Sequence, residues 1–524
     1  MKTTTKCLAL ILAVLMSLSV FVACNQQQDD SGNNGNETTL GGGNNDETTG
    51  KTDETTGSPY VEDLEGYVYR AYYWDKNQTP ADGVNQAFVP LDFYCENLGD
   101  AKDPISVAVW YRNSDIEADY NCFFEPIAST MEHTTELTGL WNSGKKYDLA
   151  VIVDTAAAQC ATLNLLTNLN NKPNLHLKEA FYDQNSVEQL SMGGVTYFIR
   201  GDMNVSSLEN SVVTIVNEKL YNSALQAGGE KPIYDIVKSG EWTMAKMMEL
   251  AGKVNKDVGE DGAFSAEAGD IWGYLPYLNS ALYHFYGCGG RITITGDDGF
   301  PTLSMGSDAS KSAVTTVMDT INLANLPTGV KTVKGSDRNN AFSAEAVLFS
   351  DTVMFDVRIA LYPTIQTWKY GILPMALQSS AQYNASSASL GHVTALQYGF
   401  GGLCLWTIPS FYNNIDNATT LFEAFAKYSA RAGGTMEAYY TRTISLQAAK
   451  DENSRQMVEL VKAGMAYDIG LAYPWGDFKG LLVSMISTNQ NPLNSLTDAK
   501  LMQAQMEMEM DIENFRYPSS PEVE

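Results

Sequence analysis

The hydrophobic positions of the chain follow two alternating spacings, and these predict strands and helices that follow one another. Short runs rich in aromatic and β-branched residues, at 66–73, 121–126 and 147–153, predict strands. The run at 147–153 is almost entirely apolar, as in a strand that is buried on both faces of a parallel sheet. Because helical spacing separates these runs, we expect an α/β body with right-handed crossovers.

Helical spacing dominates the middle and the end of the chain. Asp103 and Pro104 supply an N-cap and a first-turn proline for the first helix. Gly240 predicts the end of a second helix, and Thr243 predicts the start of a third helix, which is amphipathic. Further helices are expected towards the C-terminus, at about 418–430, 451–463 and 496–514.

The first 23 residues have the composition of a secretory signal. Two lysines form a basic start, and the 16 residues at 8–23 are apolar except for two serines. This run is shorter than the roughly 20 residues that a membrane-spanning helix needs. The sequence FVAC at 21–24 resembles a bacterial lipobox, which implies that Cys24 is diacylated and becomes the new N-terminus.

Residues 25–59 contain almost no apolar side chain. The segment consists mainly of Gly, Asn, Thr, Asp and Glu, and the sequence DETTG at 46–50 recurs at 53–57. Such a composition buries too little surface to fold, so we expect a disordered acidic tether. A flexible coil of about 35 residues has an end-to-end distance of roughly 30–35 Å, which would keep the folded body near a membrane.

The charge of the chain disfavours one class of partner. The 524 residues include 34 Lys and Arg against 62 Asp and Glu, a net charge of −28. This acidity argues against a basic surface that binds nucleic acid or anionic lipid. Most of the negative charge lies beyond the tether, where it keeps an exported body soluble.

Signatures of catalysis and of metal binding are mostly absent. The chain has no HExxH, GxSxG, Walker or GxGxxG motif, and its four histidines lie too far apart to form a helical metal pair. An odd number of scattered cysteines follows the lipobox, with no C-x-x-C spacing, so neither zinc nor a disulfide framework is expected. We expect small buried hydrophobic residues at Cys95, Cys122, Cys160, Cys288 and Cys404.

Three weaker patterns leave alternatives open. The sequence SGKK at 143–146 fits S-x-x-K, but so short a pattern arises by chance. The stretch at 257–270 invites a calcium site, although Gly259 and Ala268 stand where oxygen ligands belong, which favours a plain acidic turn. Among so many acids a carboxylate pair for glycoside hydrolysis can always be nominated, so a hydrolase stays an alternative.

Aromatic residues next to Gly and Pro are the candidate ligand contacts. Their flat faces offer a large contact area with few rotatable bonds, and their NH or OH groups can bond a ligand. Packing within the body is the alternative for each residue. The candidates follow the first strand or lie in loop-rich stretches, and they are Trp74, Asp75, Trp272, Tyr274 and Trp475.

Several segments in order resemble the extracellular solute-binding proteins of ABC importers, family 1, the maltose and oligosaccharide-binding type. The sequence YDIVKSGEWT at 234–243 closely matches the helix–Gly–x–Trp–Thr–helix element of its Gram-positive lipoprotein members, in which Trp242 packs structurally. The family's usual Gly is replaced by Glu345, and its usual Lys is missing at 375–376. The other matching segments are 147–149, 212–220, 342–349, 370–374 with 382–383, 439–440 and 451–470.

The resemblance implies a class II periplasmic-binding-protein-like fold, with two α/β lobes and a cleft between them. The expected organisation is a lipoprotein signal at 1–23, a disordered acidic tether at 24–59 and a tail at 517–524. Lobe 1 is expected to comprise 60–210 and 385–440, and lobe 2 to comprise 211–384 and 441–516.

The resemblance also implies a function without catalysis. We expect a lipid-anchored receptor on the outer face of the bacterial cytoplasmic membrane that binds a carbohydrate, with an oligosaccharide favoured, and delivers it to ABC permease subunits. We expect a monomer with no cofactor, no metal and no nucleic-acid partner. A secreted carbohydrate-active hydrolase and an adhesion or scaffold lipoprotein are the alternatives, and a peptide or another polar solute stays open as the ligand.

Overall fold

A computed structural model describes residues 62–74, 92–93, 95, 98, 104–129, 132–260, 264–277, 279–321, 335–383, 394–395, 404–441, 444, 451–488 and 490–516. The expected signal, Cys24, the tether, Asp75, His392 and the tail at 517–524 lie outside the described residues. Among the residues that are described, no helix combines the length and the apolar content that crossing a bilayer requires.

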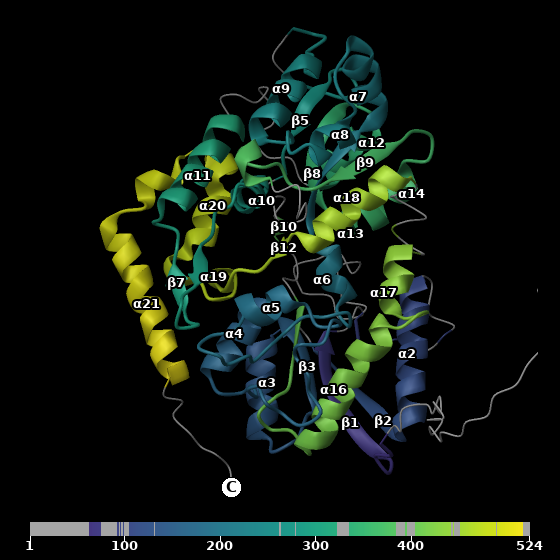
Figure 1. Ribbon diagram of the computed structural model, residues 1–524, viewed down its shortest axis with the longest axis vertical. Helices are drawn as coiled ribbons and strands as arrows, with labels where there is room; N and C mark the ends of the chain where they lie inside the picture. Colours follow the sequence, from purple (N-terminus) through teal and green to yellow (C-terminus); the bar gives the residue numbers. More distant parts are fainter. Residues whose placement is uncertain are drawn as a thin grey trace, which may run out of the picture. The chain divides into compact units, whose positions relative to one another are not determined.

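The first sheet has four strands in the order β11-β3-β1-β2, and we call it and its helices lobe 1 (Figure 1). Its strands are β1 (Tyr67–Trp74), β2 (Cys122–Ser129), β3 (Leu149–Val153) and β11 (Cys404–Thr407). β1 pairs in parallel with β2 and β3, whereas β11 pairs antiparallel with β3. The three strands predicted at 66–73, 121–126 and 147–153 are therefore confirmed, including the burial of β3.

Helices pack on both faces of this sheet. They are α2 (Pro104–Tyr120) with α16 (Ile415–Ala430), and α3 (His133–Asn142) with α4 (Asp154–Thr162). Successive side chains of a strand point to opposite faces. Accordingly, Tyr69 packs against Phe425 of α16, while Tyr72 packs against His133 of α3.

The second sheet is mixed, with the order β5-β8-β4-β9, and we call it and its helices lobe 2 (Figure 1). Its strands are β4 (Val212–Asn217), β5 (Trp272–Leu275), β8 (Val347–Val353) and β9 (Tyr370–Leu373). β4 pairs antiparallel with β8 and β9, and β5 pairs in parallel with β8. The expectation that Trp272 and Tyr274 lie in a loop is wrong, because both belong to the buried strand β5.

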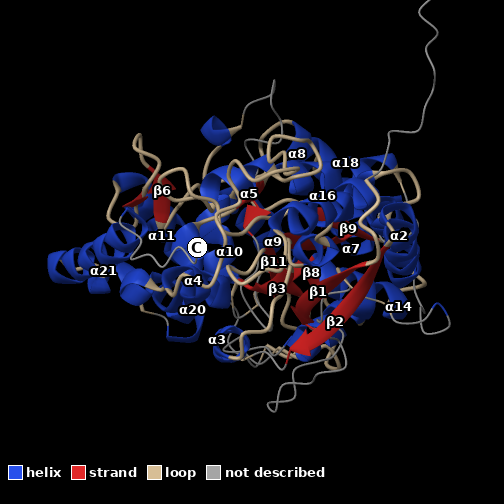
Figure 2. Cartoon of the chain, turned by 90° about the horizontal axis from the view of Figure 1, so that it is seen from below, coloured by secondary structure: helices blue, strands red, loops and turns tan. Residues whose placement is uncertain are grey.

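Helices α7, α9, α12 and α18 pack against the second sheet, and further helices of the second half of the chain lie beyond them (Figure 2). They are α7 (Glu218–Ala224), α8 (Ile233–Lys238), α9 (Met244–Val254), α10 (Ser280–Gly287), α11 (Asp308–Ile321), α12 (Gly335–Ser343), α18 (Glu452–Ala463), α20 (Phe478–Thr488) and α21 (Asp498–Arg516). Two C-terminal helices belong to this lobe, since α18 packs against β9 and α20 packs against α10, whereas α19 and α21 also contact α4 of lobe 1. The helices predicted at about 418–430, 451–463 and 496–514 are confirmed as α16, α18 and α21.

Shorter elements connect these parts. The helical ones are α5 (Gln184–Gln189), α6 (Val205–Glu209), η3 (Gln226–Gly228), α13 (Met354–Asp356), η4 (Val357–Leu361), α14 (Tyr362–Thr364), η5 (Ser380–Gln382), α17 (Thr435–Glu437), α19 (Ile469–Ala472), η8 (Trp475–Asp477) and η9 (Pro492–Ser495). The extended ones are the hairpin of β6 (Thr293–Thr295) and β7 (Pro301–Leu303), and the pair of β10 (Thr394–Ala395) and β12 (Met465–Ala466).

The turn between α8 and α9 shows how closely local sequence determines local structure. Gly240 has a φ of +74°, a conformation that favours glycine, and a Cβ there would also meet the ring of Tyr383. Thr243 is the N-cap of α9, because its side chain accepts a hydrogen bond from the amide of Lys246. Trp242 is fully buried and its Nε1 donates to the carbonyl of Pro374 at 2.9 Å, which confirms a packing role.

The chain passes between the two sheets three times. It leaves lobe 1 through α6 and enters lobe 2 at β4, it returns to lobe 1 before β11, and it re-enters lobe 2 after α16. After α18, residues 465–469 comprise β12 and the start of α19, and we call them the crossing segment. Several passages of the chain can connect two lobes and still allow them to move about a hinge.

Candidate functional site

The topology of lobe 1 marks one place where a ligand can bind. β1 connects through α2 to β2 on one side, and β2 then connects through α3 to β3 on the other side of β1. In open α/β sheets, ligands bind outside the carboxyl ends of the strands at such a switch of direction. Trp74 is the last residue of β1 and Asp154 is the first residue after β3, so both flank this switch point.

Asp154 is an acidic residue at the switch point. It begins α4, it is buried, and its Oδ1 accepts a hydrogen bond from the amide of Thr155 at 2.8 Å. Burial raises the pKa of the Asp154 carboxyl, and the positive charge of Lys479 opposes that rise. Burial in turn lowers the pKa of the Lys479 amine. Lys479 belongs to α20, so its charge acts on Asp154 from a distant part of the chain.

His133 connects the carboxyl ends of β2 and β3 through hydrogen bonds. Its Nδ1 accepts the amide of Val153 at 3.2 Å, so its Nε2 carries the proton and donates to Ser129 Oγ at 2.9 Å. Burial lowers the pKa of His133 to about 4, which keeps the ring neutral at physiological pH. A neutral imidazole thus ties the carboxyl end of β2 to the carboxyl end of β3.

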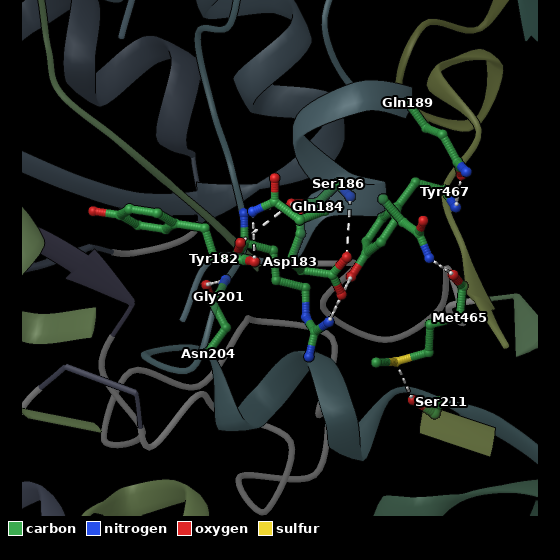
Figure 3. Close-up of polar contacts among 12 residues, drawn as sticks. Tyr182, Asp183, Gln184, Ser186, Gln189, Gly201, Asn204, Ser211, Met465 and Tyr467 are labelled. Atoms are coloured by element: carbon green, nitrogen blue, oxygen red, sulfur yellow. Dashed lines mark hydrogen bonds and ion pairs between the residues drawn. The ribbon is translucent and has the colours of Figure 1, made fainter. Parts of the chain in front are cut away.

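The crossing segment is bound to lobe 1 through a buried polar cluster (Figure 3). Arg200 Nη1 donates to Asp183 Oδ2 and to the hydroxyl oxygen of Tyr467, each at 2.6 Å. The Tyr467 hydroxyl donates to Asp183 Oδ2 at 2.9 Å, and its amide donates to Gln189 Oε1 at 2.8 Å. Asn185 Nδ2 also donates to the carbonyl of Met465 at 3.1 Å. Side chains on and just before α5 therefore hold 465–467 in place.

The next residue of the crossing segment, Asp468, is bound to lobe 2. Its buried carboxylate accepts from the Tyr286 hydroxyl at 2.9 Å, the Ile292 amide at 2.7 Å and the Thr293 hydroxyl at 2.5 Å. Burial raises the pKa of Asp468, and these donors oppose the rise. Two adjacent residues thus contact opposite lobes, which makes the crossing segment a joint between them.

A pocket of about 220 Å³ lies against this joint. One wall comes from lobe 1, another from the β6–β7 hairpin of lobe 2, and the third from the crossing segment. Its volume is below the roughly 300–1,000 Å³ of pockets that enclose drug-sized ligands. The lining residues are Glu188, Gln189, Ser191, Arg291, Thr293, Ile294, Thr295, Pro301, Tyr467, Asp468 and Ile469.

Three of the five aromatic and acidic candidates are buried in lobe 2. Trp272 packs against Phe264, with ring centroids 5.7 Å apart. The Tyr274 hydroxyl bonds the Asp351 carboxylate, and the Trp475 Nε1 donates to Asp511 Oδ2 at 2.8 Å.

The structure brings none of these three side chains into the pocket at the joint. Trp74 ends β1 at the switch point, but its side chain lies outside the described residues, as does all of Asp75. Ligand contact by Trp74, Asp75, Trp272, Tyr274 and Trp475 stays a prediction.

Sequence reasoning missed the residues that do meet at the joint. Asp154 directly follows an apolar strand, and this signal would identify it once the strand order is known. Arg200 and Tyr467 are 267 residues apart, and no local pattern connects them. In the described part of 257–270, Asp270 accepts the amides of Val258 and Ser265, and the preference for a plain acidic turn stays a prediction.

The histidines and cysteines that the structure describes pack or pair with neighbouring side chains. His284 is fully buried with its Nε2 2.9 Å from Asp351 Oδ2, and His176 pairs with Glu423. The expectation for the cysteines is confirmed, because five are free and buried: Cys95, Cys122, Cys160, Cys288 and Cys404. In the described part of the chain, no three His, Cys, Asp or Glu residues gather as a metal site would require.

Comparisons with known proteins identify the fold. The chain matches no protein-family model and no curated protein sequence. A cyclo/maltodextrin-binding protein complexed with maltotetraose is 14% identical, with a TM-score of 0.51, over 88% of this chain and 99% of that chain.

Two further solved structures were found at TM-scores below 0.5. The GacH receptor of Streptomyces glaucescens is 14% identical over 86% of this chain and 99% of its own, at 0.48. The maltose/maltodextrin-binding domain of Bdellovibrio bacteriovorus, bound to maltotriose, is 11% identical over 85% and 100%, at 0.49. The fold of this chain is periplasmic-binding-protein-like, with two α/β lobes.

Proposed function

We propose that this protein is a lipid-anchored extracellular receptor of an ABC importer, which binds a carbohydrate between its lobes and delivers it to the permease. One observation carries the proposal: two α/β lobes are joined by three passages of the chain, with a switch point at one sheet and a joint at the crossing segment. This architecture suits closure around a ligand, with the affinity set by contacts made in the closed state minus the cost of closing.

The fold neighbour supports the ligand class. It is described as a maltodextrin-binding protein with bound maltotetraose, so a carbohydrate is the first ligand to test on this chain. Trp74 at the end of β1 is suited to stack on a sugar ring, and Asp75 and Asp154 are suited to accept hydrogen bonds from sugar hydroxyls.

The leader and the tether support the location. The apolar run at 8–23, the lipobox-like sequence at 21–24 and the acidic segment at 25–59 fit export, lipidation of Cys24 and attachment by a leash. A flexible tether with an average end-to-end distance of about 30–35 Å would keep an anchored receptor close to its permease.

A thermal-shift screen over mono- and oligosaccharides tests the ligand. A ligand at 100 times its Kd stabilises the folded state by about 2.7 kcal/mol, which raises the Tm by a few degrees. We expect a rise with a defined set of sugars and none with peptides. A response to peptides alone would overturn the carbohydrate assignment, and release of reducing ends during long incubation would favour the hydrolase instead.

Metabolic labelling with a fatty-acid analogue tests the anchor. We expect labelled protein in the membrane fraction of the wild type and none for Cys24→Ser. Cys7→Ser is the matched control, because it lies in the same leader but outside the lipobox-like sequence, and it should be labelled as the wild type is. Labelling of Cys24→Ser would refute lipidation at that residue.

A further inference from the structure

Two tight turns of the backbone touch tip to tip beside the joint. The turn at 192–195 is closed by two backbone hydrogen bonds between its end residues, 2.9 and 3.0 Å long. The turn at 296–300, at the tip of the β6–β7 hairpin, is closed by a bond of 2.8 Å from its first amide to its last carbonyl. The Gly193 amide donates to the Gly299 carbonyl at 2.8 Å, and we call this meeting of the two turns the tip contact.

The two turns are attached to different lobes. Shortly after the first turn, the Tyr197 carbonyl accepts the hydroxyl of Thr407 of β11 at 2.6 Å, which ties this turn to the sheet of lobe 1. Just before β6, the Arg291 carbonyl accepts the hydroxyl of Ser310 of α11 at 2.8 Å. Because α11 packs against α9 and α10, the hairpin is attached to lobe 2. The tip contact therefore bridges the lobes at a place where the chain itself does not pass between them.

The packing at the tip contact leaves no space for a side chain at Gly193. A Cβ there would lie 2.1 Å from Phe300 Cζ and 2.6 Å from each Cε, so the edge of the ring points at the backbone of lobe 1. Gly193 and Gly299 have φ values of +59° and +78°, in the region that favours glycine. A displacement of either turn would thus break the hydrogen bond or drive the ring into the backbone.

The last turn of α21 supports the same ring. The Arg516 guanidinium lies 4.6 Å from the centroid of the Phe300 ring, and its Nη2 is 3.4 Å from Asp298 Oδ2. The preceding residue, Phe515, packs against Tyr197 with ring centroids 5.5 Å apart. α21 therefore reaches both sides of the tip contact, the hairpin through Arg516 and lobe 1 through Phe515.

Such a contact resists motion between the lobes. In a hinge motion the lobes move as rigid bodies, and packed interfaces exchange between discrete arrangements instead of deforming continuously. A backbone hydrogen bond tolerates only a narrow range of lengths and angles, and a ring that meets a glycine backbone edge-on has no room to slide. The two turns must therefore separate when one lobe rotates relative to the other.

We propose that the tip contact restrains the lobes in the arrangement of this structure and breaks when they rotate to another arrangement. Phe300 carries most of the restraint, because the Arg516–Asp298 pair is exposed and such pairs contribute little. The proposal goes beyond the receptor function, since it depends only on the attachment of the two turns to different lobes. A failure of the sugar screen or of the lipidation test would leave it standing.

The distance between the lobes can be measured with two spin labels. Tyr111→Cys on α2 of lobe 1 and Asn222→Cys on α7 of lobe 2 place the labels at exposed positions. The full chain also carries Cys7→Ser and Cys24→Ser, and its other five cysteines are buried. Pulsed electron paramagnetic resonance then gives the distribution of distances between the lobes without any added ligand.

Two substitutions of partly buried rings are compared. Phe300→Ala removes the ring from the tip contact, and Phe264→Ala is the matched control, because Phe264 packs on Trp272 within lobe 2. We expect the fraction of molecules outside the main wild-type distance peak to rise about fivefold in Phe300→Ala, since a partly buried ring loses its packing. Phe264→Ala should keep the wild-type distribution, and Arg516→Ala should change it less than Phe300→Ala does.

Hydrogen exchange of the unlabelled full chain tests the same contact without spin labels. The Gly193 amide, which donates across the tip contact, should exchange at least about fivefold faster in Phe300→Ala than in the wild type. The Val195 amide, which donates within its own turn, should keep its rate.

An unchanged distance distribution in Phe300→Ala would overturn the proposal, whether or not the Gly193 amide exchanges faster. Equal shifts of the distribution in Phe300→Ala and Phe264→Ala would do the same. Equal acceleration of the Gly193 and Val195 amides would also contradict it, because the turn itself would then have unfolded.

Discussion

Acidification should destabilise this protein through His133. The ring is buried at the carboxyl ends of β2 and β3, where its unprotonated Nδ1 accepts the Val153 amide. Protonation would remove this acceptor, leave the Val153 amide facing a second N–H, and place a positive charge in a buried site. The pKa of His133 is accordingly lowered from 6.5 to about 4.

The size of the effect follows from linkage. A base whose pKa is lower when folded binds its proton more tightly when unfolded, so stability falls as the pH drops below 6.5, and the loss is complete below about pH 4. With these two values the loss is about 1.4 kcal/mol at pH 5.5 and about 2.6 kcal/mol at pH 4.5. Above pH 7 the ring is neutral in both states and contributes no pH dependence.

Urea unfolding at several pH values, compared between the wild type and His133→Asn, measures this effect. His133→Asn loses some contacts, which lowers its free energy of unfolding by a constant amount at every pH, but it has no imidazole to titrate. The difference in free energy of unfolding between the two proteins should therefore narrow by about 2–3 kcal/mol from pH 7.5 to 4.5.

The protonation of His133 can also be measured directly in the wild type, which avoids relying on a variant that fails to fold. The ring carbon signals of the wild-type histidines, followed by NMR, should show His133 neutral down to about pH 5. Titration of His133 near 6.5, or parallel loss of stability in wild type and His133→Asn, would refute the reasoning.

Three further substitutions test the joint and the packing of lobe 2, each by urea unfolding. A Cβ at Gly470 would lie 2.7 Å from Ile292 Cγ2, so Gly470→Ala should lower the free energy of unfolding by about 1–3 kcal/mol. Gly139 in α3 has open space around it, so the control Gly139→Ala should raise the free energy of unfolding by up to about 1 kcal/mol. Equal effects of the two substitutions would contradict this reasoning. Tyr467→Phe removes the hydroxyl that bonds the Arg200–Asp183 pair and should cost about 1–3 kcal/mol, and a neutral result would show that the cluster does not hold the crossing segment. Trp242→Phe leaves the Pro374 carbonyl unpaired and opens a cavity, so a cost under about 1 kcal/mol would argue against its packing role.

Local features of the fold were predictable from the sequence because their causes are local. Gly240 ends a helix because its φ is positive, Thr243 starts one because its side chain binds an amide three residues on, and the apolar run of β3 is buried because parallel strands have helices on both faces. The misplacement of Trp272 and Tyr274 has a local cause as well. Four residues with two aromatic rings and a glycine carry too short a pattern to distinguish a buried strand from a loop.

The candidate site was less predictable, because its residues come together only in space. Trp475 has the sequence surroundings of a ligand contact, yet its ring stacks on Tyr473 at 4.9 Å and its Nε1 bonds α21. The same aromatic face that suits a ligand also suits a neighbouring helix, and only tertiary packing decides between them.

The sequence by itself determined the alternation of strands and helices and the acidic segment with its lipobox-like start, since composition and periodicity depend on neighbouring residues. The expectation of two lobes came from the family resemblance. The tertiary structure alone decided that Asp154 opposes Lys479 and that Tyr467 and Asp468 bind different lobes. It also decided which methionines of α21 stay exposed. The reason is physical: burial, charge pairing and hydrogen bonding depend on the distance between groups in space, and strand order sets that distance for residues hundreds of positions apart.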